Sequence, residues 1–161
     1  MADRERDAGQ TAPPWRGFHH VALVTPDLDA TIRFYGEVLG MTVLADIPAS
    51  ARGGRHCLLA VDGDAGSFLH FFERADARIH PYPLAEGVVF PPELGALHHL
   101  AIALPDEEAG LALRARLVAA GVPVTEIMSQ GSTIRDMLFP DNNGLLLEAA
   151  WPSTRRHSGT E

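Results

Sequence analysis

The sequence predicts an α+β protein built from two copies of one module, in which a strand and a helix are followed by three strands (βαβββ). The main observation is a repeat. His-His-Val-Ala-Leu at 19–23 precedes Pro26-Asp27, and the similar His-His-Leu-Ala-Ile at 98–102 precedes Pro105-Asp106. The same offset separates all of these matched positions, so the chain of 161 residues divides into two equivalent halves.

The first module begins with an apolar strand at 19–25, which Pro26 ends. A helix is expected next, because Asp27 can cap its N-terminus and apolar residues then recur at helical spacing up to Gly40. Those apolar residues are Leu28, Ile32, Tyr35 and Leu39. Three strands complete the module, at 42–47, 56–61 and 68–72.

The second module repeats this order. A strand is expected at 99–104 and a helix at 106–120. Three strands are then expected, at 124–128, 133–139 and 145–150. Asp-Asn-Asn-Gly at 141–144 predicts a tight turn between the last two strands, because Asn and Gly tolerate positive φ.

Composition predicts the boundaries of these modules. Flexible tails are expected at 1–16 and 152–161, where charged and small polar residues show no hydrophobic periodicity. The first module is expected at 17–74 and the second at 97–151, with a Pro-rich linker at 75–96 between them.

Composition also excludes several classes of partner. The formal net charge is -8 and the basic residues are dispersed, so nucleic acid is not expected to bind. Cys57 is the only cysteine, which rules out a disulfide within the chain. The first residues lack the apolar core of a signal peptide, and no apolar stretch is long enough to span a membrane. We therefore expect a soluble, cytoplasmic protein with no membrane partner.

Ligand-type side chains occupy equivalent positions in the two modules. Each module begins with a His-His pair and ends with an apolar strand that carries one polar residue, His70 in the first and Glu148 in the second. An unpaired carboxylate facing a core would carry a large desolvation cost, which a bound metal ion would remove. Imidazole and carboxylate suit borderline divalent metals. Which histidine of each pair would bind is left open, because neighbours on a strand point to opposite faces.

A longer series of residues carries a likeness to a known family. The series is His20-Val-Ala-Leu, Asp27-Leu, Phe34-Tyr35, Val38-Leu-Gly-Met, Leu69-His70, His99, the turn Pro140-Asp-Asn-Asn-Gly and Glu148. Together these residues resemble the vicinal oxygen chelate superfamily, which includes glyoxalase I, extradiol dioxygenases and bleomycin-binding proteins. The likeness spans about 18–151 and implies paired βαβββ modules that form a cupped mixed sheet around a metal site.

The resemblance implies a divalent-metal-dependent enzyme whose metal chelates two adjacent oxygens of a small substrate. The metal ligands would be His20, His70, His99 and Glu148. Glu148 and His70 would also be the catalytic groups. His19 and His98 would then lie on the opposite strand face.

Three functions remain open for this set of residues. A ring-cleaving, extradiol-type dioxygenase with Fe²⁺ is favoured, since two His and one carboxylate suit iron and oxygen chemistry. The alternative is a glyoxalase- or epimerase-type lyase or isomerase, with Ni²⁺, Zn²⁺, Mn²⁺ or Co²⁺ and with Glu148 as base. The third is a non-enzymatic antibiotic-binding protein, although such relatives lack the ligand residues. The resemblance also allows a homodimer, because modules of this family pair within one chain or across two.

Overall fold

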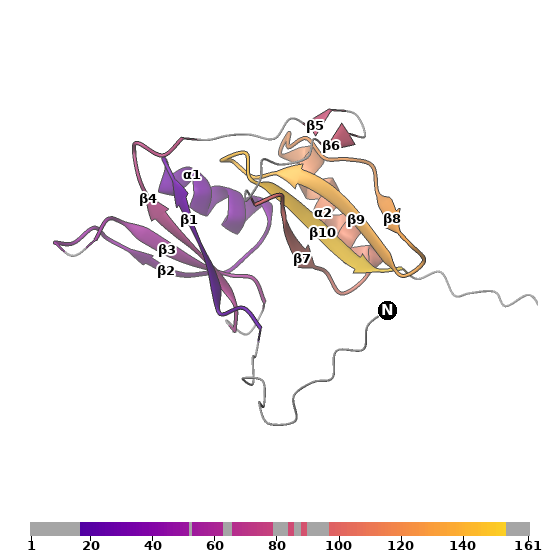
Figure 1. Cartoon of the computed structure of the whole chain (residues 1–161), viewed down its shortest axis with the longest axis horizontal. Coiled ribbons are helices and arrows are strands. Elements are labelled where there is room, and N and C mark those ends of the chain that lie inside the picture. The colour runs from indigo at the N-terminus through magenta and orange to yellow at the C-terminus, as the bar shows by residue number, and fades with distance from the viewer. Residues whose placement is uncertain are drawn as a thin grey trace, which may run out of the picture.

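The computed structural model describes residues 17–51, 53–62, 66–78, 84–85, 88–89 and 97–153. Two four-stranded mixed sheets dominate it, each with a helix on one side (Figure 1). The first module consists of β1 (His20–Thr25), α1 (Leu28–Arg33), the π-helix η1 (Phe34–Val38), β2 (Val43–Ile47), β3 (His56–Ala60) and β4 (Phe68–Glu73). The second consists of β7 (Leu100–Ala103), α2 (Glu107–Ala119), β8 (Met128–Gln130), β9 (Ile134–Pro140) and β10 (Leu146–Pro152). A short antiparallel pair, β5 (Leu84–Ala85) and β6 (Val88–Val89), lies between them in sequence.

The two modules have the same strand order, β1-β4-β3-β2 in the first and β7-β10-β9-β8 in the second. In each module the first strand is parallel to the last, and the other neighbours are antiparallel. The predicted α+β fold with two βαβββ modules is confirmed, and with it the equivalence of the two halves. Within the described ranges, no strand of one module pairs with a strand of the other.

Each helix begins at the aspartate that the sequence predicts. Asp27 and Asp106 each accept a hydrogen bond from the backbone N–H three residues later, at 2.8 and 2.9 Å. Both carboxylates satisfy a backbone donor that has no partner within the helix. The helical segments are followed by Gly40 and Gly121, whose φ values of +78° and +72° favour glycine. The start and stop signals in the sequence therefore act as expected.

The helix expected from Leu28 to Leu39 divides into α1 and the π-helix η1. The Leu39 N–H donates to the Phe34 carbonyl at 3.0 Å, five residues earlier. Such a wider turn is found in short segments, often near functional sites. Both Phe34 and Tyr35 are buried here, although they are neighbours in the chain.

One predicted strand is wrong in position. The sequence suggests a strand at 124–128, whereas β8 covers only Met128–Gln130. Thr125 gives the reason: its N–H donates to the Leu138 carbonyl at 3.0 Å, but its hydroxyl accepts the return hydrogen bond from the Leu138 N–H at 2.9 Å. The Thr125 side chain thus takes the place of its backbone carbonyl in the pairing, and Pro123, two residues earlier, has no N–H to donate.

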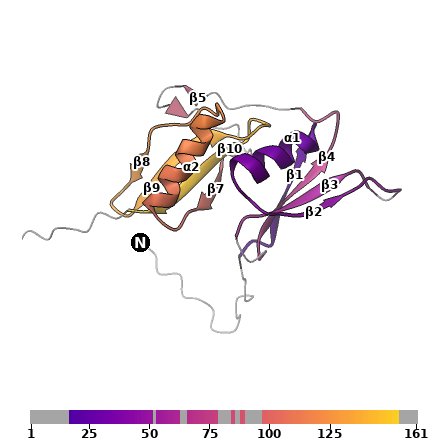
Figure 2. The same ribbon diagram turned by 180° about the vertical axis from the view of Figure 1, so that it is seen from behind.

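The helices and sheets form two layers. Figure 1 shows the sheets in front, and Figure 2, from behind, shows α1 and α2 in front of them. The core lies between the layers and includes Tyr35, Phe71, Leu117, Met137 and Trp151. Each sheet therefore has a helix-free face, and both of these faces are turned to the same side of the molecule (Figure 1).

Polar contacts join the two modules at the turn between β9 and β10. Asn142 and Asn143 of this turn donate to the Thr31 hydroxyl of α1, at 3.1 and 3.3 Å. Arg116 of α2 also donates to the Glu37 carbonyl of η1, at 2.6 Å. The predicted turn at 141–144 therefore helps to set how the two modules sit relative to each other.

The predicted N-terminal tail at 1–16 lies outside the described residues, as do most of the C-terminal tail and of the linker at 75–96. The boundaries drawn around them stay predictions. The longest described helix, α2, has 13 residues, and none of the described helices has the length and apolar character of a membrane span.

Candidate metal centre

The helix-free face of the first sheet carries His20 and His70. In the parallel pairing of β1 with β4, His20 lies opposite Phe68 and Ala22 lies opposite His70. Side chains two residues apart on a strand share a face, so both imidazoles point to the same side of the sheet. Their ring centroids are 5.9 Å apart. We call this pair the first half-site.

His70 has the properties of a metal ligand. Its Nε2 atom is buried and has no hydrogen-bond partner among the described residues. Its ring packs against Phe72, with centroids 4.0 Å apart, and against His56 at 5.1 Å. Burial lowers the pKa of His70 below its ordinary value, and the nearby His56 and His20 lower it further. A neutral imidazole with an unbonded nitrogen is the form that binds a metal ion.

The second module carries the other two predicted ligands, Glu148 on β10 and His99 directly before β7. The His99 Nε2 atom lies 3.1 Å from the Glu148 Oε2 atom, and the Glu148 side chain is 18 % exposed. Burial is the main cause that raises the pKa of Glu148; His99 opposes this effect and the charge of Asp136 adds to it. We call His99 and Glu148 the second half-site.

The two half-sites do not meet within one chain. In the part of the chain that the structure describes, no three His, Cys, Asp or Glu side chains are grouped so that they could hold one ion. The half-sites lie on separate sheets, whose helix-free faces are turned to the same side (Figure 1). The four expected ligands are therefore present as two pairs, and their convergence on one ion stays a prediction.

His19 and His98 do not lie on the opposite strand faces that the sequence suggests. The Nδ1 atoms of His19 and His20 are 2.8 Å apart, and those of His98 and His99 are 2.7 Å apart. Strand β1 begins only at His20 and β7 only at Leu100, so the pleat that separates neighbouring side chains is missing at these pairs. Each of the two histidines expected to bind metal, His20 and His99, thus has a second imidazole hydrogen-bonded to it.

Asp136 was not predicted from the sequence, yet it lies beside the second half-site. Asp136 pairs with Ala150 in the register of β9 and β10, which places it on the same face as Glu148. It is 1 % exposed, and neither of its carboxylate oxygens has a hydrogen-bond partner in the described ranges. The sequence does contain the signal, because an acidic residue inside an apolar strand is the feature that singles out Glu148.

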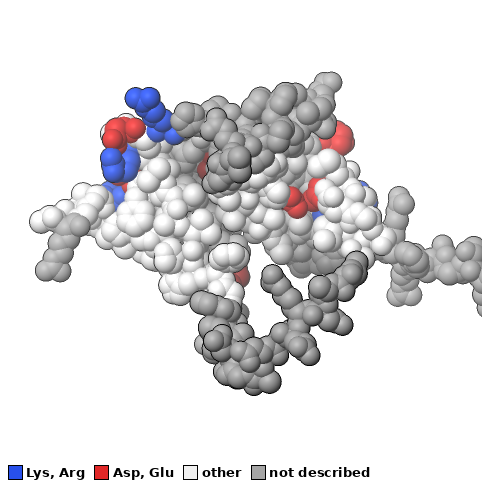
Figure 3. Space-filling view, in the orientation of Figure 1, with Lys and Arg blue, Asp and Glu red and all other residues white. Residues whose placement is uncertain are grey.

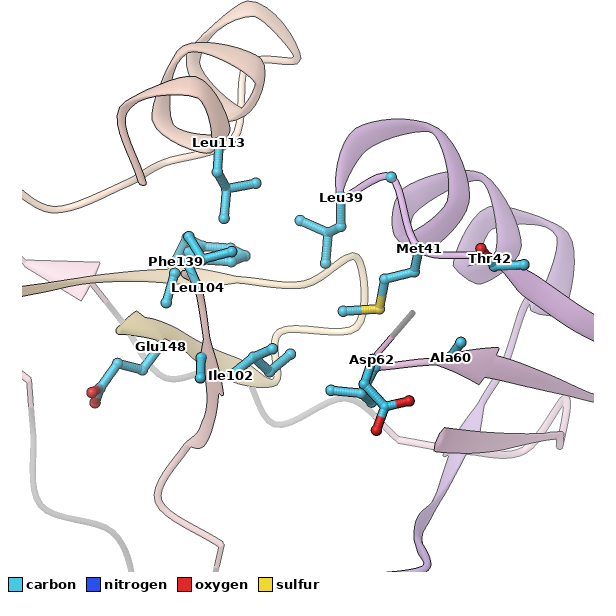
Figure 4. A pocket seen from close by; sticks show the side chains of 14 residues that line it. Leu39, Met41, Thr42, Ala60, Asp62, Ile102, Leu104, Leu113, Phe139 and Glu148 are labelled. Atoms are coloured by element: carbon cyan, nitrogen blue, oxygen red, sulfur yellow. The ribbon is translucent and has the colours of Figure 1, made fainter. Parts of the chain in front are cut away.

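A cavity of about 210 Å³ lies between the modules, next to the second half-site. Figure 4 shows Leu39 and Met41 of the first module facing Leu113 and Phe139 of the second. Glu148 borders the cavity, but its carboxylate points away from these apolar side chains (Figure 4). None of the residues that line the cavity is a histidine, so the cavity is separate from the first half-site.

Comparisons with known proteins agree with this architecture. The sequence profile of the Glyoxalase/Bleomycin resistance protein/Dioxygenase superfamily matches residues 17–149. No match is found among curated proteins.

Several solved structures share the fold. SMU.1112c is 30 % identical, with a TM-score of 0.63, and the match covers 84 % of this chain and 98 % of that one. The glyoxylase/bleomycin resistance protein/dioxygenase domain from Frankia sp. EAN1pec is 21 % identical, with a TM-score of 0.67 and coverage of 86 % and 99 %. TnmS3, an antibiotic binding protein from Streptomyces sp. CB03234, is 22 % identical, with a TM-score of 0.61 and coverage of 88 % and 100 %. Because the profile matches most of its length, the chain belongs to the Glyoxalase/Bleomycin resistance protein/Dioxygenase superfamily.

Proposed function

We propose that this protein is a divalent-metal-dependent enzyme that acts on a small substrate through two adjacent oxygens. The observation that carries the proposal is the second half-site, where the half-buried Glu148 carboxylate lies 3.1 Å from His99 Nε2. The donor set fits a metal, because imidazole and carboxylate suit borderline divalent ions and His70 offers a buried, unbonded nitrogen. An ion held there would supply Lewis-acid chemistry to the substrate oxygens.

A second copy of the chain would complete the site. One chain offers only two ligands on each sheet, whereas catalytic metal sites use three or more protein ligands. A twofold axis that brings the first half-site of one copy to the second half-site of the other forms the same contact twice. The dimer would then hold two complete sites, each with His20 and His70 from one chain and His99 and Glu148 from its partner.

The surroundings of the half-sites favour an uncharged, largely apolar substrate. Ala22, Val24 and Phe72 line a hollow on the helix-free face of the first sheet, and Val24 is 57 % exposed. The same side of the molecule is mainly white in Figure 3, with most of the basic side chains at one edge. Arg135 of β9 pairs with Glu107 of α2 at 3.4 Å, on the helix side of its sheet. It is therefore not placed to attract an anionic substrate to Glu148.

Ring cleavage of a catechol-like substrate, an extradiol dioxygenase reaction, is the favoured chemistry. His20, His99 and Glu148 supply two imidazoles and one carboxylate, the set that suits Fe²⁺. The lowered pKa of His70 keeps this imidazole neutral, so it can accept a proton from a substrate hydroxyl or serve as a fourth ligand. The apolar hollow beside it would exclude water from the substrate ring.

A glyoxalase- or epimerase-type reaction is the second candidate, and the raised pKa of Glu148 favours it. A carboxylate whose pKa is raised by burial is a stronger base for removing a proton next to a carbonyl group. Two assays separate the candidates. Fe²⁺-loaded dioxygenase should consume oxygen with a catechol, whereas Ni²⁺-loaded lyase or epimerase should exchange the α-proton of a hydroxycarbonyl compound in D₂O.

A complementation experiment tests the shared metal site. One chain carries His20→Ala and His70→Ala, and the other carries His99→Ala and Glu148→Ala. Each variant alone should lose metal. The mixed dimer, co-expressed with two different tags that contain no histidine, should hold about half the wild-type metal content, because one of its two sites is intact.

The outcomes separate the hypotheses. Wild-type protein that binds none of Fe²⁺, Ni²⁺, Zn²⁺, Mn²⁺ and Co²⁺ would contradict the metal proposal and favour an antibiotic-binding protein. Wild type that binds metal, with no recovery in the mixed dimer, would place the complete site within one chain.

A further inference from the structure

The histidine before each proposed ligand histidine is hydrogen-bonded to it in the same way. The Nδ1 atoms are 2.8 Å apart in the His19–His20 pair and 2.7 Å apart in the His98–His99 pair. The two rings of each pair lie edge to face, with interplanar angles of 77° and 83°. At this distance one nitrogen must carry a proton and the other must accept it. The arrangement occurs in both modules, at positions that the repeat makes equivalent.

We propose that His19 and His98 are positioning residues that engage Nδ1 of His20 and His99 and thereby leave Nε2 as the metal-binding nitrogen. The inference rests on the proposed function, because it concerns ligands of the proposed metal. A histidine that binds a metal through one nitrogen usually donates the N–H of the other to a neighbouring acceptor, which fixes its tautomer and its orientation. Here the acceptor is a second imidazole from the same strand end.

The surroundings of His99 favour one placement of its protons when no metal ion is bound. Its Nε2 atom lies 3.1 Å from Glu148 Oε2, and the nearby carboxylate favours the tautomer of a neutral His99 that carries its proton at Nε2. The Nδ1 atom of His99 then has only a lone pair. It must accept the proton that His98 carries at Nδ1, across the distance of 2.7 Å.

Metal binding requires the opposite arrangement. His99 must lose its proton from Nε2 and be protonated at Nδ1, where it donates to His98. The shared proton moves from His98 Nδ1 to His99 Nδ1, the former Nε2 proton of His99 leaves, and His98 gains a proton at its own Nε2. The pair keeps the same number of protons, so the direction of the hydrogen bond reverses without a change of charge.

His20 in the first module is held on two sides. Its ring stacks on Phe68, with centroids 5.1 Å apart and an interplanar angle of 7°. The ring of His19 contacts the same Phe68 at 5.3 Å while its Nδ1 meets that of His20. The two contacts orient His20 so that its Nδ1 faces His19, which leaves Nε2 as the nitrogen directed away from the pair.

A matched pair of substitutions tests this role. Asn places an amide atom near the position of His Nδ1, whereas Leu has the same branched shape without a hydrogen-bonding atom. His98→Leu should weaken Zn²⁺ binding by about 10- to 100-fold, and His98→Asn should stay close to wild type, both measured by calorimetry. His19→Leu and His19→Asn give the same comparison at an exposed position, where a folding defect is not expected.

Long-range ¹H–¹⁵N spectra at about pH 8, above the ordinary histidine pKa of about 6.5, report which nitrogen carries each proton. Metal-free wild type should have His98 protonated at Nδ1 and His99 at Nε2, and both should switch when Zn²⁺ is added. Equal affinity in wild type and both variants, or a metal-free His98 protonated at Nε2, would overturn the inference. Wild type that binds no Zn²⁺ would contradict the proposed function instead, and the metal-free spectrum would still decide whether His98 donates to His99.

Discussion

Tyr35 and Asp141 join the two modules through a buried hydrogen bond. The Tyr35 hydroxyl donates to Asp141 Oδ2 at 2.9 Å, and the two residues are 0 % and 6 % exposed. The other oxygen, Oδ1, accepts hydrogen bonds from the Asn143 and Leu145 N–H groups, both at 2.8 Å. One carboxylate therefore shapes the turn between β9 and β10 and also holds η1 of the first module.

Tyr35→Phe should lower the free energy of unfolding by about 1–3 kcal/mol, because it leaves a buried carboxylate oxygen without its donor. Urea unfolding measures this change. A double-mutant cycle with Asp141→Asn isolates the contact, and we expect a coupling energy of about 0.5 kcal/mol or more. If the two substitutions change the free energy of unfolding additively, the Tyr35–Asp141 hydrogen bond does not stabilise the contact between the modules.

Tyr35 also shows how far the sequence can predict the fold. Its helical spacing predicts a core position, which is confirmed, because caps and periodicity act within one element. The partner of its hydroxyl lies 106 residues away, and no local pattern encodes such a contact. Each module carries its own local signals, so the repeat predicts that the two modules have the same fold. Those signals do not describe contacts between the modules, so the repeat does not predict how the modules sit relative to each other.

The candidate site, too, could be predicted from the sequence only in part. Ligand-type residues are recognisable one by one, but their grouping into two pairs depends on how the modules are joined, which the turn at 141–144 helps to determine. Strand parity predicts opposite faces for His19 and His20 only if the strand runs through both residues. It begins at His20, so the hydrogen bond between these imidazoles could not be foreseen.

Gly110→Ala should destabilise the protein although alanine is the better helix former. A Cβ atom at Gly110 would lie 2.8 Å from the buried Trp151 ring. Overpacking of this kind costs about 1–3 kcal/mol, whereas the gain in helix propensity is about 1 kcal/mol. Thermal unfolding followed by tryptophan fluorescence measures the net loss.

Gly36→Ala is the matched control for this change. A Cβ atom there would meet its nearest neighbour, a methyl group of Val43, at 3.6 Å, an ordinary contact. It should therefore leave the melting temperature unchanged or raise it. A Gly110→Ala protein that is as stable as Gly36→Ala would show that Trp151 has room to shift.

Divalent metal should raise the melting temperature, and Glu148→Gln should reduce that rise. Binding to the folded state alone adds about 2.7 kcal/mol at a hundredfold excess over Kd, which corresponds to roughly 5–11 °C for a chain of this size. The rise should be smaller at pH 6 than at pH 8, because the three proposed imidazole ligands must be neutral. Glu148→Gln removes the only anionic ligand, so it should reduce the shift more than His70→Gln does.

Glu126→Gln provides the control for the metal titration, since the Glu126 side chain is 93 % exposed and lies in neither half-site. Its metal-induced shift should match that of wild type. Equal shifts in wild type and Glu148→Gln at pH 8 would remove Glu148 from the proposed metal site.

The raised pKa of Glu148 predicts a pH dependence in the metal-free protein. Burial is the main cause that raises this pKa above its ordinary value of 4.5, so the folded state holds the proton more tightly than the unfolded chain does. Its contribution to the free energy of unfolding is therefore fully present below pH 4.5 and is lost as the pH rises through the folded-state pKa. Gln cannot ionise, so the stability of Glu148→Gln relative to wild type should increase between about pH 4 and about pH 7.

The lowered pKa of His70 acts in the opposite sense, because its contribution to the free energy of unfolding is lost as the pH falls below 6.5. This contribution is common to both proteins and cancels in the difference between them. Urea unfolding in the presence of EDTA measures the difference at each pH. A flat difference for Glu148→Gln would mean that burial of this carboxylate does not disfavour its charge.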